Sequence, residues 1–171
     1  MPTSPAQPPA GWRPDKFAVA YGDPSGSYLP SLGWRVTKSH DLSTDNADLF
    51  TVTGKVAITL LTGEVTTVVG GACTYAMRVK TTNEAIFPAT TIDTNAVGTM
   101  YLFSGDPTTT RGTPTTRVGF IDGVGPLSPL IVGLAGGSLV IQSDLDAADT
   151  GVVAWTLYYQ PLESGAYVAA A

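Results

Sequence analysis

The sequence predicts an all-β protein: an antiparallel two-sheet sandwich, expected to be a jelly roll, with an extended proline-rich N-terminal arm. Three observations predict this class. Many short segments alternate apolar and polar residues with a period of two, glycine, proline or aspartate separates most of them, and no window keeps a helical period beyond about one turn. The short gaps leave no room for crossover helices, so the sheets are expected to be antiparallel. On this basis, residues 1–45 form the arm and linker and residues 46–171 form the sandwich domain.

The first 30 residues are distinguished by their many prolines, each of which fixes φ and removes a backbone hydrogen-bond donor. Large aromatic side chains lie between these prolines, and a simple linker has no need of such rings. We therefore expect the arm to dock, either on its own domain or on a neighbouring molecule, with plain disorder as the remaining alternative. The expected contact residues are Trp12, Phe17, Tyr21, Tyr28 and Trp34.

The strands are predicted from residue 46 onwards, and the segments 55–61, 72–80 and 151–160 show the clearest alternation. In a strand, every second side chain lies on the same face, so the apolar series is expected to face the core. The inward side chains are expected to be Val56, Ile58, Leu60, Cys73, Tyr75, Met77, Val79, Val153, Trp155, Leu157 and Tyr159. The other predicted strands are 49–53, 84–92, 98–105, 116–122, 128–133 and 137–144.

Composition excludes several classes of partner. Hydrophobic residues make up 43% of the chain, which is enough for a core, whereas charged residues make up only 13%, about half the usual share. The net charge is −5 and the nine basic residues are scattered, which argues against binding to nucleic acid or to a membrane surface. A single cysteine excludes an intrachain disulfide framework and a cysteine-based zinc site.

Residues capable of catalysis are few. His40 is the only histidine, and its polar surroundings (TKSHDLSTD) predict an ordinary solvated loop histidine rather than a catalytic base. Cys73 lies on the apolar face of its strand and is expected to be a buried structural thiol. The segment VGLAGGSLVI lacks the residues of a phosphate-binding loop and predicts a tight turn joining two strands. No catalytic residues and no cofactor are expected.

Two groups of aspartates raise the question of a metal site. Calcium requires about six converging oxygen ligands, and neither spacing matches an EF-hand loop. Aspartates also cap turns by accepting hydrogen bonds from nearby backbone N–H groups, and this role is the expectation here. A weak calcium site at the second group stays open as an alternative. The first acidic cluster comprises Asp41, Asp45 and Asp48, and the second acidic cluster comprises Asp144, Asp146 and Asp149.

The segment 104–117 (SGDPTTTRGTPTTR) is long, polar and rich in threonine, proline and glycine. Loops of this kind project from sandwich edges and often carry recognition residues. Arg111 and Arg117 are candidate contacts for an acidic partner surface, and a solvated hairpin loop without a partner is the alternative.

The segments LFTVTGKVAITLLTGEVTT, DTNAVGTMYLF and SLVIQSDLDAADTGVVAWTLYYQPLESGAYV resemble small structural proteins of tailed bacteriophages, of the decoration, cement or head-fibre type. The resemblance covers about residues 46–168. It lies in the general pattern of residue types along these segments rather than in a catalytic motif. It implies a jelly roll that often forms trimers on the capsid exterior, and it brings no catalytic residues. The proline-rich arm is not part of the pattern.

These observations favour a virion structural protein. The expected molecule is a homo-oligomer, expected to be a trimer, that binds the major capsid protein on the capsid surface and stabilises contacts between subunits as a decoration or cement protein. A tail or fibre module that binds a host receptor or glycan is the alternative. A third class, an enzyme such as a glycan hydrolase, would require two carboxyl groups about 5–10 Å apart in a cleft.

Overall fold

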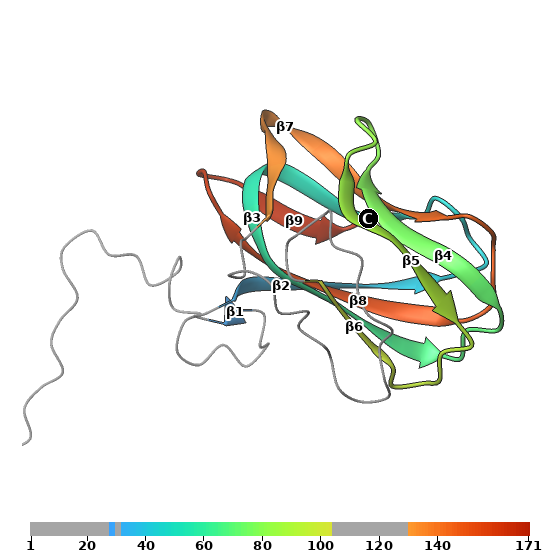
Figure 1. Ribbon diagram of the computed structural model, residues 1–171. Coiled ribbons are helices and arrows are strands. Elements are labelled where there is room, and N and C mark those ends of the chain that lie inside the picture. Colours follow the sequence, from blue (N-terminus) through green and yellow to red (C-terminus); the bar gives the residue numbers. More distant parts are fainter. Residues whose placement is uncertain (1–27, 30–31, 104–129) are drawn as a thin grey trace, which may run out of the picture.

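The computed structural model describes residues 28–29, 32–103 and 130–171 (Figure 1). These residues form strands and connecting turns without a helix, and every strand pairing between them is antiparallel, which confirms the all-β prediction. It follows that this part of the chain has no helix that could span a membrane. The strands are β1 (Tyr28–Leu29), β2 (Gly33–Asp41), β3 (Asp48–Thr67), β4 (Ala72–Val79), β5 (Ala85–Asp93), β6 (Met100–Phe103), β7 (Leu130–Leu145), β8 (Val152–Pro161) and β9 (Tyr167–Ala170).

The 20-residue strand β3 organises the sheet, because it pairs with four other strands. Its first part pairs with β7 and β9, and its second part pairs with β8 and β6. The ladder with β7 shifts register between Thr53 and Gly54, and Gly54 has a positive φ of 68°, a conformation that glycine adopts without strain. One continuous sheet therefore curls into a first half (β9-β3-β7-β4-β5) and a second half (β1-β2-β8-β3-β6).

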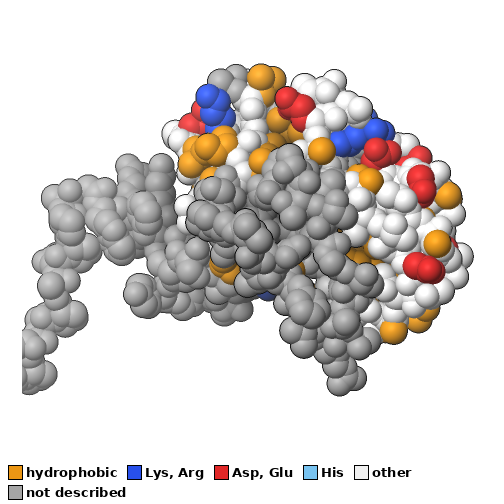
Figure 2. Space-filling view, viewed as in Figure 1, with side chains coloured by type: hydrophobic (Ala, Val, Ile, Leu, Met, Phe, Trp, Pro, Cys, Tyr) orange, Lys and Arg blue, Asp and Glu red, His pale blue; other side chains and the backbone are white. Residues whose placement is uncertain are grey.

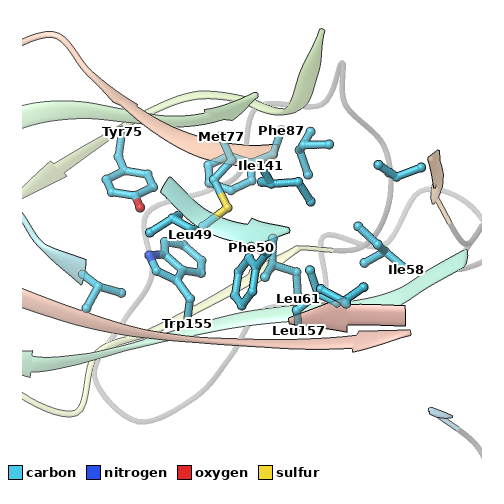
Figure 3. Close-up of a cluster of buried hydrophobic side chains, with 14 of the residues drawn as sticks. Leu49, Phe50, Ile58, Leu61, Tyr75, Met77, Phe87, Ile141, Trp155 and Leu157 are labelled. Atoms are coloured by element: carbon cyan, nitrogen blue, oxygen red, sulfur yellow. The ribbon is translucent and has the colours of Figure 1, made fainter. Parts of the chain in front are cut away.

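The two halves of the sheet face one another across a single apolar core. The ring of Trp155 in the second half lies 5.3 Å from that of Tyr75 and 5.8 Å from that of Phe87, both in the first half (Figure 3). On its own half, Trp155 pairs with Gly63 of β3, where an added Cβ would lie 2.7 Å from the indole ring. The glycine thus leaves the space that the largest ring of the core occupies.

The inward faces predicted from the alternation are confirmed in β4 and β8, whose apolar series are all buried. The prediction for Leu60 is wrong, because Leu60 is partly exposed and Leu61 is fully buried instead. The reason is a register shift between Ile58 and Leu60 in the ladder with β8, which moves the alternation by one residue.

Two expected breaks do not divide the chain. The segments 49–53 and 55–61 are parts of the single strand β3, and the segments 128–133 and 137–144 fall largely within the single strand β7. The glycine-rich stretch expected as a tight turn is a bulge, since Thr53 pairs with Ser138 and Gly54 pairs with Leu134. Residues 135–137 are thus inserted into β7 without reversing the chain.

The residues expected as arm and linker include a strand of the sheet, since Gly33–Asp41 forms β2 and pairs with β8 from Trp34 to Asp41. The alternation is present in β2, but its inward face carries Lys38 and His40 beside Trp34 and Val36, which hides the apolar pattern. Residues 1–27 of the expected arm lie outside the described residues, as does the predicted strand 116–122.

Candidate functional site

The contact residues predicted from the sequence are only partly described by the structure. Tyr28 in β1 pairs with Trp34 in β2, so these two are brought together. Trp34 is partly buried and packs against the core, and it therefore belongs to the body of the domain rather than to an arm. The predicted contacts that lie outside the described residues are Trp12, Phe17, Tyr21, Arg111 and Arg117.

His40 is buried, at 2% exposure, so the expectation of a solvated loop histidine is wrong. Its Nδ1 lies 2.9 Å from the Tyr75 hydroxyl, and its Nε2 lies 2.9 Å from the carbonyl oxygen of Thr44. A carbonyl only accepts, so Nε2 carries the proton and donates it to Thr44, and Nδ1 accepts from the Tyr75 O–H. The imidazole is thus held neutral and in one tautomer, and burial lowers the pKa of His40.

Ser143 lies beside His40, with its Oγ 3.3 Å from His40 Nε2, but the pair is not arranged for nucleophilic catalysis. Because Nε2 already bears the proton, it cannot take one from the Ser143 hydroxyl. The Ser143 Oγ also accepts from the backbone N–H of Ala47 at 2.9 Å, and the serine is fully buried. The arrangement fixes the turn after β2 against β7, which is a structural role.

The second acidic cluster is engaged in contacts between strands and turns: Asp144 lies in β7 and forms an ion pair, whereas Asp146 and Asp149 accept hydrogen bonds from backbone N–H groups. Each of its carboxylates already has a partner in the protein, and the hydrogen bond from the Thr74 N–H lowers the pKa of Asp146. In the three described ranges, no group of three or more His, Cys, Asp or Glu residues is placed to hold a metal ion. The partners are the Arg78 guanidinium for Asp144, the N–H of Thr74 for Asp146, and the N–H groups of Gly71 and Thr150 for Asp149.

The first acidic cluster is also engaged. Asp41 accepts from the N–H of Ser43, Asp45 accepts from the N–H of Leu145, and Asp48 forms an ion pair with Lys80. Cys73 is buried, and burial raises the pKa of its thiol to about 11, so the prediction of a buried thiol is confirmed.

The candidate binding surface is a set of large apolar side chains exposed at one end of the curled sheet. We call it the apolar end patch and define it as Ile131, Leu134, Leu162 and Tyr167, which are 50–66% exposed. Figure 2 shows hydrophobic side chains at the upper left, over the end where β7, β3 and β9 meet in Figure 1, beside charged side chains of both signs. Exposed apolar side chains that gather in this way mark interaction sites more often than single ones do.

The four patch residues are held by backbone pairing along the segment Thr53–Ala57 of β3. Three members are fixed by strand register: Tyr167 pairs with Thr53, Leu134 with Gly54 and Ile131 with Ala57. The fourth, Leu162, follows β8 and donates its backbone N–H to the carbonyl oxygen of Lys55 at 2.9 Å. The patch is therefore built on regular sheet rather than on a projecting loop.

Two further contacts hold the strands at this end. The Glu163 carboxylate accepts from the N–H of Lys55 at 3.0 Å, which ties the turn between β8 and β9 to β3. At Gly133 an added Cβ would lie 2.1 Å from the carbonyl oxygen of Gly54, so β3 and β7 approach closely here. The sequence does not indicate this surface, because the glycine-rich stretch of β7 predicts a turn and the residues after 160 do not predict a strand.

Two more exposed apolar residues, Val68 and Val97, lie near the opposite end of β3. Val69 donates its N–H to Asn95 and Gly98 donates to Val65, which places both valines beside the C-terminal end of that strand. We call them the distal valines. They match the patch in chemistry and exposure but not in position.

Comparison of the chain with protein-family models, with curated proteins and with solved structures finds no match in any of the three.

Proposed function

We propose that this chain is a structural protein of virus particles, a jelly-roll type of sandwich that self-associates and binds the capsid exterior. The observation that carries the proposal is the apolar end patch, a rigid group of exposed apolar side chains on one end of the sheet. The resemblance to phage decoration and cement proteins supports a capsid as the surface bound. The low share of charged residues, 13%, suits packed contacts between proteins.

The size of the patch argues for repeated contacts rather than for one tight contact. Full burial of a large apolar side chain is worth about 1.5–3 kcal/mol, and these four side chains are half to two-thirds exposed. Together they offer about 3–7 kcal/mol, whereas association alone costs about 4–15 kcal/mol. A single patch therefore binds weakly. A homo-oligomer, such as the expected trimer, repeats this weak contact between its copies and against a capsid lattice, and gains affinity through avidity.

The chemistry of the described residues favours a non-catalytic role. The one histidine of the chain is buried and held as a fixed neutral tautomer, so it is not available as a general base at a surface cleft. Ser143 and Cys73, which carry nucleophilic groups, are buried as well.

Binding to particles tests the proposal directly. Purified capsids that lack this protein are mixed with the intact chain, with a Leu134→Ser/Tyr167→Ser variant and with a Val97→Ser control, and are then sedimented. We expect the intact chain and the control to sediment with the particles, and the patch variant to stay in the supernatant. Equal sedimentation of all three would contradict the role of the patch. Binding to a glycan array without binding to capsids would replace the proposal with a receptor-binding module.

A further inference from the structure

We draw no further inference here: the strongest candidate, the outward sheet face of β2, β8 and β3 on which Thr37, Thr156 and Thr62 form a row across the strands, carries nothing because the described residues do not show what covers it.

Discussion

Acidification should destabilise the fold through His40 in a predictable way. The imidazole is buried and neutral, with Nε2–H bonded to Thr44 and Nδ1 bonded to the Tyr75 hydroxyl. Burial lowers the pKa of His40 more strongly than the hydrogen bond to Thr44 and the nearby Asp41 and Asp45 raise it, so the pKa in the folded state lies below 6.5. The unfolded chain therefore binds a proton at a higher pH than the folded chain does. The stability from this group is fully present above about pH 6.5 and is lost as the pH falls through the folded pKa.

The size of this pH effect follows from the single proton that His40 binds when the chain unfolds. Between the unfolded and folded pKa values, the free energy of unfolding falls by at most about 1.4 kcal/mol per pH unit. His40→Gln is the matched variant, because its side-chain amide can donate to Thr44 and accept from Tyr75 without titrating. We expect urea unfolding between pH 7.5 and 5 to show a steeper loss of stability for the intact chain than for the variant. Subtracting the free energy of unfolding of the variant from that of the intact chain at each pH removes the contribution of the carboxylates, which both proteins share.

Parallel stability curves would refute this reasoning, since the histidine would then titrate equally in the folded and unfolded states. A chain that becomes more stable than the variant as the pH falls would also refute it, because the sign would require a raised pKa. The Tyr75 hydroxyl does not titrate in this range, as burial raises its pKa well above 10.

Three other perturbations test the packing. Gly133→Ala should lower the free energy of unfolding by about 1–3 kcal/mol through backbone strain alone, because Gly133 has a φ of +146°. The added Cβ would also meet the backbone of Gly54. Urea unfolding that is unchanged by the substitution would contradict this prediction. The Cys73 thiol, with its pKa raised to about 11, should resist alkylation at pH 8 until denaturant is added, and rapid labelling of the folded chain would count against its burial. A chelator should leave the melting temperature unchanged, because the carboxylates of the second acidic cluster are already paired, and a drop of several degrees would reveal a metal.

The sequence predicted the strands best where one face is uniformly apolar. In β4 and β8 the period-two pattern alone was enough, because every inward position carries an apolar or aromatic side chain or the Cys73 thiol. It failed in β2, whose inward face includes His40, a polar side chain that is buried only because Tyr75 and Thr44 satisfy both ring nitrogens. Thr44 is four residues away, but Tyr75 is 35 residues away and leaves no signal in the sequence around His40.

The binding surface was harder to predict than the fold. Glycine predicts a break at Gly54 and in the bulge of β7, but strand pairing continues through both. The apolar end patch exists because the register of β7 and β9 on β3 brings together Leu134 and Tyr167, which are 33 residues apart in the chain. Period-two alternation describes one strand at a time, so it does not predict which outward residues become neighbours.

Sedimentation equilibrium of the intact chain tests most directly the claim that the protein works by burying the apolar end patch against other proteins. It is measured over a series of micromolar concentrations beside the Leu134→Ser/Tyr167→Ser variant, with Val97→Ser at the distal valines as the control. We predict a mass several times that of one chain for the intact protein and the control, with a trimer expected, and the mass of one chain for the patch variant. Equal masses for the intact protein and the patch variant, whether monomeric or oligomeric, would contradict the claim.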